Sequence, residues 1–187
     1  VNANVMNSAA TSASCVEIQF ALISHTNNGK TTLVRTLTGI DVGEVRDAAH
    51  VTLSAESHPL LTTPPGDTLQ LWDTPGFGDS VRLCTRLGMS GNPIGWFLRD
   101  VLDRYRDRPF WLSQQALRTA RDAADVVLYL VNSSESPVDA GYLASEMKIL
   151  DWLGKPVVVL LNQVGAPRPA PQESMEQALW QQHLAQY

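Results

Sequence analysis

The chain has 187 residues, of which 44% are hydrophobic and 18% charged, and its formal net charge is −5. This length is enough to bury one good core, and the acidic balance argues against nonspecific nucleic-acid binding. The sequence has no apolar run of about eighteen residues and no secretory signal pattern, and Cys15 and Cys84 lack metal-ligand spacing. We therefore predict a cytoplasmic protein that does not span a membrane.

The expected elements alternate between strands and helices along the chain. Residues 1–14 are small and polar without periodicity, which predicts a disordered tail before a folded domain at 15–187. Strands are expected at 16–23, 51–61, 68–72, 126–131 and 157–161. Helices are expected at 31–38, from Asn92 onward, at 113–124, from Ser136 to a stop at Gly154, and at 173–187 after a proline-rich loop.

This order predicts a three-layer α/β fold with a mostly parallel sheet and helices on both faces. The sequence TTPPG at residues 62–66 has the composition of a tight turn, so the strands on either side of it are expected to pair antiparallel at one sheet edge.

A phosphate-binding loop is expected where the first strand ends. Residues 24–31 read SHTNNGKT, which matches the motif G-x-x-x-x-G-K-[ST] except that Ser24 replaces the first glycine. Backbone N–H groups around Asn28 and Gly29, with the start of the following helix, can hold a polyphosphate. Lys30 would reach the β and γ phosphates, and the Thr31 hydroxyl would ligate Mg²⁺. The segment predicts a nucleoside triphosphatase.

A second motif follows the strand at 68–72. Asp73 stands at the strand's end, and Thr-Pro-Gly76 follows it. The carboxylate can hold Mg²⁺ through water, and a glycine lets a backbone N–H approach the γ-phosphate. Alone, D-x-P-G is a common turn. Downstream of the lysine motif, it is interpreted as the second half of one site.

Together these motifs resemble those of the P-loop GTPases, within the class that contains Era and TrmE, over residues 16–162. The runs GKT, RTLT, DTPG and LLNQ are most similar to those of bacterial proteins assigned as GTPases that carry an uncharacterised C-terminal domain. The resemblance implies a G domain that binds GTP with Mg²⁺ and changes shape on hydrolysis. The class adds a sixth strand after the helix that ends here at Tyr187, so we expect a G domain (residues 15–187) truncated before its last strand.

The resemblance also nominates a switch threonine. Thr52 follows Asp47 by five positions, as in the class pattern for a threonine that binds Mg²⁺, and it is predicted to be catalytic together with Lys30. Alternatively, Thr52 only opens the strand at 51–57. Residues 77–92 are expected to form a mobile second switch, through which a protein effector would bind. An effector surface of aromatic residues, or instead a cover for the sheet, is predicted for Trp96, Phe97, Phe110 and Trp111.

Two positions bear on the rate of hydrolysis. Asn27 occupies the place where potassium-activated members of the class carry a K⁺ ligand, although an asparagine there also simply shapes the loop. Phe77 stands where Ras-like members have a glutamine that orients water, so we expect slow hydrolysis.

The base-reading motif departs from the family pattern. Where N-K-x-D is expected, residues 162–165 read NQVG, so Gly165 offers no carboxylate to guanine. Asn162 can still order the loop, and the Gln163 stem can lie against the base. Two functions follow: a slow Mg²⁺-dependent GTPase switch, or a nucleotide-dependent interaction module with little hydrolysis and relaxed base specificity. The expected nucleotide contacts are Asn27, Asn28, Gly29, Lys30, Thr31, Thr32, Thr52, Asp73, Gly76, Asn162 and Gln163.

Overall fold

The computed structural model of the chain describes residues 15–39, 55–88 and 103–187. The predicted tail and Thr52 lie outside these ranges, as do residues 92–102 of the helix expected from Asn92, whereas residues 103–106 are helical. The described strands form a five-stranded sheet in the order β2-β3-β1-β4-β5. The strands are β1 (Glu17–Ser24), β2 (Glu56–Thr62), β3 (Thr68–Asp73), β4 (Val126–Asn132) and β5 (Val157–Asn162). All neighbours pair parallel except β2 and β3, which pair antiparallel. The predicted sheet and its antiparallel edge are confirmed.

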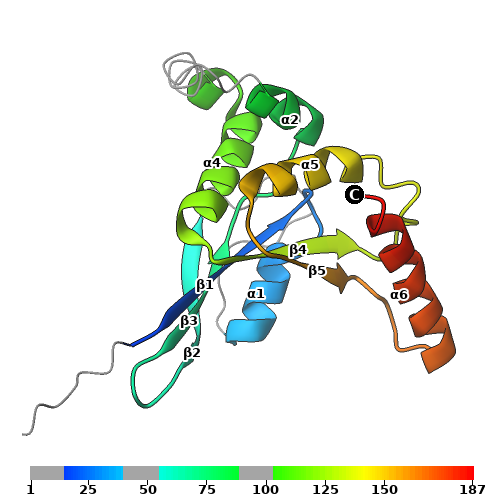
Figure 1. Cartoon of the computed structure of the whole chain (residues 1–187), viewed down its shortest axis with the longest axis horizontal. Coiled ribbons are helices and arrows are strands. Elements are labelled where there is room, and N and C mark those ends of the chain that lie inside the picture. The colour runs from blue at the N-terminus through cyan, green and yellow to red at the C-terminus, as the bar shows by residue number, and fades with distance from the viewer. Residues whose placement is uncertain (1–14, 40–54, 89–102) are drawn as a thin grey trace, which may run out of the picture.

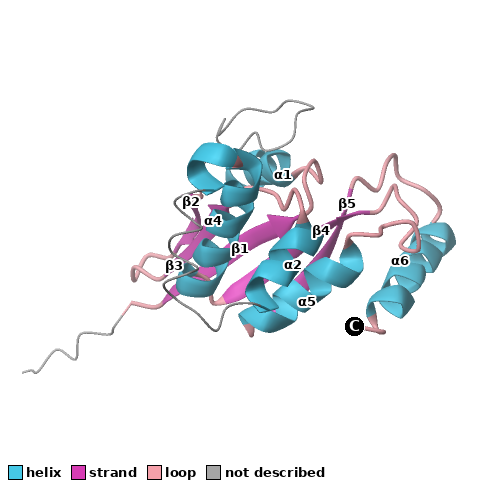
Figure 2. Cartoon of the chain, turned by 90° about the horizontal axis from the view of Figure 1, so that it is seen from above, coloured by secondary structure: helices cyan, strands magenta, loops and turns pink. Residues whose placement is uncertain are grey.

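Helices cover both faces of this sheet. The described helices are α1 (Lys30–Thr38), α2 (Ser80–Gly88), α4 (Arg108–Ala123), α5 (Leu143–Leu153) and α6 (Ala170–Leu184). Figure 1 shows α1 on one face and α2, α4 and α5 on the other. Seen from above in Figure 2, α4, α2 and α5 lie side by side over the sheet, and α6 stands beyond β5. None of these helices is long and apolar enough to cross a bilayer.

The central strands are buried on both faces, which explains their continuous apolar sequences. In β1, Ala21 and Ile23 belong to the large core cluster that also contains residues of α4 and α5. Leu22 between them belongs to a second cluster with Val34 of α1. Because successive side chains of a strand point to opposite faces, β1 contributes to both clusters and holds the centre of the molecule.

Two helix ends follow the predicted glycine signal. α1 ends at Gly39, whose φ of 67° is left-handed and whose N–H donates to Arg35 O. α5 ends in the same way at Gly154, with φ of 64°. A residue without Cβ adopts this conformation at little cost, so glycine ends a helix efficiently.

The predicted start of α5 at Ser136 is wrong. The segment after β4 forms successive turns, with Asp139 N donating to Ser136 O at 3.0 Å and Leu143 N donating to Ala140 O at 3.0 Å. The helix begins only at Leu143. These turns place the Tyr142 ring on His25, 4.3 Å between ring centroids, a packing that no local pattern encodes.

Two other helices begin earlier than predicted. α4 begins at Arg108, because the Asp107 side chain caps it by accepting from Phe110 N at 3.3 Å and a proline stands in its first turn. α6 begins at Ala170, so the proline-rich loop is shorter than expected.

The segment predicted as a mobile second switch is partly helical. α2 occupies Ser80–Gly88, with Leu83 and Leu87 buried. Phe110 is also buried in the large cluster, which supports the alternative that it covers the sheet over a place in an effector surface. Trp96 and Phe97 lie outside the described residues, and Trp111 is partly exposed.

Candidate nucleotide-binding site

The two predicted motifs lie together at one sheet edge. The phosphate loop (residues 24–31) follows β1, and the DTPG turn (residues 73–76) follows β3. These strands are parallel neighbours, and Leu22 is in register with Asp73. Their carboxyl ends therefore bring both loops to the same point, where ligands bind in open α/β sheets.

The phosphate loop is held open by left-handed backbone. Asn27 has φ of 65° and Gly29 has φ of 83°. A Cβ on Gly29 would be strained by this φ and would lie 2.8 Å from Asn162 Nδ2, so that amide would have to move. Asn28 is buried, and its Nδ2 donates to Leu130 O of β4 at 3.2 Å. Thr32 lies in the first turn of α1 and is exposed. The loop can present backbone N–H groups to an anion.

Lys30 is buried where the phosphates are expected. Only 6% of its surface is exposed, and Nζ donates to Ser24 Oγ at 2.8 Å. Burial lowers the pKa of Lys30 to about 8, although the charges of Asp73 and Glu146 oppose this. The hydroxyl at Ser24, where the motif has glycine, thus contacts the motif lysine. A buried ammonium of this kind suits an anionic ligand.

Asp73 and Thr31 form a pair of hard oxygen groups beside Lys30. Thr31 Oγ1 donates to Asp73 Oδ2 at 2.8 Å. Asp73 Oδ1 is buried and has no hydrogen-bond partner among the described residues. Burial raises the pKa of Asp73, and the hydrogen bond from Thr31 opposes this shift. An orphaned carboxylate oxygen next to a hydroxyl fits Mg²⁺, which takes one or two protein oxygens and completes its shell with phosphate and water.

The DTPG turn packs directly against the phosphate loop. A Cβ on Gly76 would lie 2.9 Å from Lys30 Nζ and 3.0 Å from Thr26 Cα. The next residue, Phe77, donates its N–H to Ser24 O at 2.9 Å and accepts from Thr26 N at 3.1 Å. Its side chain is fully buried in the large core cluster. Gly76 therefore stands at the predicted place, while the Phe77 side chain packs into the core.

The base-side residues reach the phosphate loop through their amides. Asn162 Nδ2 donates to Asn28 O at 2.7 Å, and Gln163 Nε2 donates to Asn27 O at 3.1 Å. Gly165 has φ of 77° and offers only backbone. The structure thus brings Asn162 and Gln163 to the candidate site as supports of the loop.

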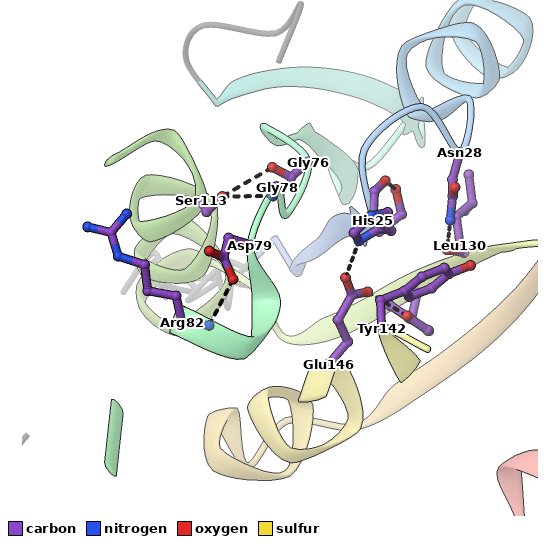
Figure 3. A network of polar contacts seen from close by, with 12 residues as sticks. His25, Asn28, Gly76, Gly78, Asp79, Arg82, Ser113, Leu130, Tyr142 and Glu146 are labelled. Atoms are coloured by element: carbon purple, nitrogen blue, oxygen red, sulfur yellow. Dashed lines mark hydrogen bonds and ion pairs between the residues drawn. The ribbon is translucent and has the colours of Figure 1, made fainter. Parts of the chain in front are cut away.

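One buried network is not predicted by any motif of the sequence. Figure 3 shows its contact between His25 and Glu146. Glu146 of α5 is fully buried and accepts from His25 Nδ1 at 2.8 Å and from Tyr129 OH at 2.6 Å. Burial and the Glu146 charge raise the pKa of Tyr129, so the phenol remains a donor. The available signal was an acid within an apolar helical stripe, since Glu146 lies three and four residues from Leu143 and Leu150, which are also buried.

The Asn162 contact leads to a first prediction. Asn162→Ala removes the donor to Asn28 O, so we expect the affinities for GDP and for a non-hydrolysable GTP analogue to fall together, by roughly three- to tenfold. Equilibrium titration with fluorescent nucleotides measures both. Gln163→Ala is the matched control, and its effect should be smaller because Gln163 is exposed. Loss of affinity for only one nucleotide would show that Asn162 does not act on the shared loop.

Known proteins share the motifs and the fold described above. A family model described as 50S ribosome-binding GTPase matches residues 19–163, which contain both motifs and Asn162. No curated protein matches the chain.

Several solved structures have a similar fold. A variant of Era from Aquifex aeolicus bound to GDP and AlF₄⁻ superposes with a TM-score of 0.65 and 20% identity, over 92% of this chain and 48% of that one. Era in complex with MgGDPNP and a segment of 16S ribosomal RNA gives 0.62 and 20%, over 88% and 46%. A structure of the chloroplast translocon components atToc33 and psToc159 gives 0.58 and 15%, over 90% and 61%.

The chain spans about half the length of the Era structures, and the superpositions show that it shares their fold. The match to the family model over residues 19–163 covers more than half of the chain and assigns the family. The chain belongs to the 50S ribosome-binding GTPase family.

Proposed function

We propose that this protein is a molecular switch that binds GTP with Mg²⁺ and hydrolyses it slowly. The observation that carries the proposal is the buried Lys30 ammonium beside the pair of Thr31 and Asp73, whose Oδ1 has no hydrogen-bond partner among the described residues. Lys30 and Thr31 lie at the start of α1, and Asp73 lies at the end of β3. A magnesium-bound polyphosphate requires such a cation and such hard oxygen ligands close together.

Each residue would then have a distinct role. Lys30 binds the β and γ phosphates, and the Gly76 N–H donates to the γ-phosphate. Thr31 and Asp73 hold Mg²⁺, together with Thr52, which lies outside the described residues. When bound, Mg²⁺ neutralises charge on the β and γ oxygens. Water attacks the γ-phosphorus and the bond to the β–γ bridging oxygen breaks, so that GDP and inorganic phosphate leave and a proton from the water passes to the phosphate or to solvent.

The proposed low rate rests on Phe77. Its side chain is buried in the core, so the position after Gly76 offers no polar group to orient water. Asn27 is the candidate K⁺ ligand, and an added cation there would offset charge in the transition state. We expect turnover to be faster in potassium than in sodium if Asn27 has that role.

The first experiment measures binding and turnover of GTP, GDP and ATP with Mg²⁺, in potassium and in sodium. Saturable GTP binding that weakens in EDTA, with slow phosphate release, would support the proposal. Asp73→Asn is the matched variant, and it should remove most of the Mg²⁺ dependence. Failure of the wild-type protein to bind any triphosphate would overturn the proposal, and magnesium-independent binding would overturn the assigned metal ligands.

A second candidate function is favoured by Gly165 and Phe77 together. A protein that lacks the base-reading carboxylate and the water-orienting glutamine can act as a nucleotide-dependent interaction module with little hydrolysis and relaxed base specificity. Base-indifferent binding without turnover would support this alternative over the switch.

The base-reading position yields another prediction. Gly165→Asp supplies the carboxylate that accepts from guanine, so the ratio of GTP to ATP affinity should rise by roughly ten- to hundredfold. Aspartate is among the residues that tolerate the left-handed φ of 77° found here. Competition titration gives the ratio directly, and Gly165→Asn is the control without the charge. An unchanged ratio in Gly165→Asp would show that the base does not lie against this loop.

The partners beyond the nucleotide remain proposals. We propose that a protein effector binds the switch regions and that the protein acts in the cytoplasm. The ribosomal RNA in one Era structure is bound by a longer protein, of which the match covers 46%. The net charge of −5 gives this chain no general attraction for nucleic acid.

A further inference from the structure

Ser113 of α4 contacts the DTPG turn from the side opposite the phosphate loop. It is fully buried, and its Oγ accepts from Gly78 N at 3.1 Å. Its hydroxyl hydrogen lies within reach of Gly76 O at 3.4 Å and of Pro109 O in its own helix at 3.2 Å. Figure 3 shows Ser113 facing Gly76 and Gly78 from the α4 helix. The Ser113 side chain thus contacts both ends of the segment Gly76-Phe77-Gly78.

The other side of this segment is tied to the phosphate loop. Phe77 exchanges two backbone hydrogen bonds with the loop, to Ser24 O at 2.9 Å and from Thr26 N at 3.1 Å. The buried Phe77 ring anchors the same residue in the core. On the α4 side the segment is held by the bond from Gly78 N to Ser113 Oγ, with the Gly76 carbonyl 3.4 Å from the same hydroxyl. On the other side, the N–H of the Gly76–Phe77 peptide donates to Ser24 O of the phosphate loop.

This arrangement matters because Gly76 has no side chain to limit its backbone. A glycine occupies a wide range of φ and ψ, so the direction of its N–H depends on the groups that hold the peptides on both sides of its Cα. Among the described residues, the peptide that carries the Gly76 N–H has one contact, from Thr74 Oγ1 to Pro75 O at 3.4 Å, and Ser113 contacts the peptide that follows. The Gly76 N–H donates to no other described residue. A donor that must meet a phosphate oxygen contributes most when its direction is set before the ligand arrives.

Ser113 also does more than a buried serine in a helix requires. Its hydrogen-bonding capacity can be met within the helix by Pro109 O, as is common for helical serine. The bond accepted from Gly78 N is additional, and Gly76 O is a second acceptor within reach of the same hydroxyl hydrogen. These two contacts join residues that are 35 and 37 positions apart in the sequence. The other buried polar side chain on this helix, Gln114, donates instead to Asp103 Oδ2 at 2.9 Å, while Ala116 and Ala120 are apolar.

We propose that Ser113 is a positioning residue that orients the Gly76 N–H toward the terminal phosphate and so helps the site distinguish a triphosphate from a diphosphate. The inference rests on the proposed function, because it assumes that this edge of the sheet binds a nucleotide. It predicts an effect on the γ-phosphate alone, since the α and β phosphates are bound by the phosphate loop.

The test compares two affinities in Ser113→Ala. Affinity for a non-hydrolysable GTP analogue should fall by roughly three- to tenfold, while affinity for GDP should change less than about twofold. Ser113→Thr keeps the hydroxyl and should restore much of the difference. Ala120→Gly is the matched control, because it weakens the same helix without contacting the turn, and its ratio of the two affinities should stay at the wild-type value.

The outcomes separate this inference from the function on which it rests. Equal loss of both affinities in Ser113→Ala, an unchanged ratio, or the same change in Ala120→Gly would overturn the role of Ser113 and leave the switch intact. If Ser113→Ala does not fold, the ratio in Ser113→Cys, which keeps only a weak donor, decides the question in the same way. Wild-type protein that binds neither nucleotide would overturn both proposals.

Discussion

Replacing Lys30 with methionine is expected to abolish triphosphate binding and, at pH 7, to raise the free energy of unfolding of the nucleotide-free protein. Burial lowers the pKa of Lys30 from 10.5 to about 8, so holding the charged ammonium in the folded state is unfavourable. The shift corresponds to roughly 3 kcal/mol at most, part of which the lost hydrogen bond to Ser24 offsets. The buried Lys30 ammonium thus lowers the stability of the nucleotide-free protein, and a bound polyphosphate would neutralise its charge.

The pH dependence gives this prediction its sign. Between pH 8 and 10.5 the unfolded chain binds more protons at Lys30 than the folded chain does, so the stability of the wild-type protein gains from this group as the pH rises. The advantage of Lys30→Met should be full below pH 8 and should vanish toward pH 10.5.

Urea unfolding in EDTA at neutral and alkaline pH, with wild type and variant compared at each pH, measures the difference. Lys148→Met, at an exposed position, is the control and should change stability little at any pH. A less stable Lys30→Met at pH 7, or a difference that does not change with pH, would contradict the assigned cost of burial.

The second large effect is expected at Glu146. Removing its carboxylate in Glu146→Ala leaves the buried Tyr129 hydroxyl without its acceptor, takes the partner from His25 Nδ1 and opens a cavity. We expect the free energy of unfolding to fall by roughly 3 to 4 kcal/mol. Chemical denaturation measures the loss. Nucleotide affinity should fall as well, since His25 belongs to the phosphate loop.

A double-mutant cycle separates the hydrogen bond from the cavity. Tyr129→Phe removes the hydroxyl that Glu146 accepts from. Adding Glu146→Ala to Tyr129→Phe should therefore lower the free energy of unfolding by less than Glu146→Ala does in the wild type. Glu17→Ala, at an exposed position in β1, controls for the loss of one negative charge. Strict additivity of the two substitutions would show that Tyr129 and Glu146 are not coupled.

The features that the sequence predicted correctly are local. Gly39 and Gly154 end helices because a left-handed residue at that position is a property of a few consecutive residues. The phosphate loop and the DTPG turn each occupy a short run with characteristic spacing, and two parallel strands are enough to bring them to one edge. The sheet, its antiparallel pair and the place of Lys30, Asp73 and Gly76 could therefore be anticipated.

Errors at element boundaries have a different cause. At α4 the cause is local, because the Asp107 cap and the proline in the first turn start the helix at Arg108. The start of α5 at Leu143 was not readable in this way. Ser136 and the proline after it have the composition of a helix start, but the turns that follow place Tyr142 against His25, and this tertiary contact outweighs local preference.

By itself, the sequence determined that the chain would form a mostly parallel sheet with the loop of residues 24–31 and the DTPG turn at one edge, because spacing and periodicity act over a few residues. Only the tertiary structure decided what supports that edge. Glu146 meets His25 across 121 positions, and Ser113 meets Gly76 across 37. A buried glutamate or serine looks the same in sequence whether it holds a loop or only fills its own helix, since the partner is chosen by how the helices pack over the sheet.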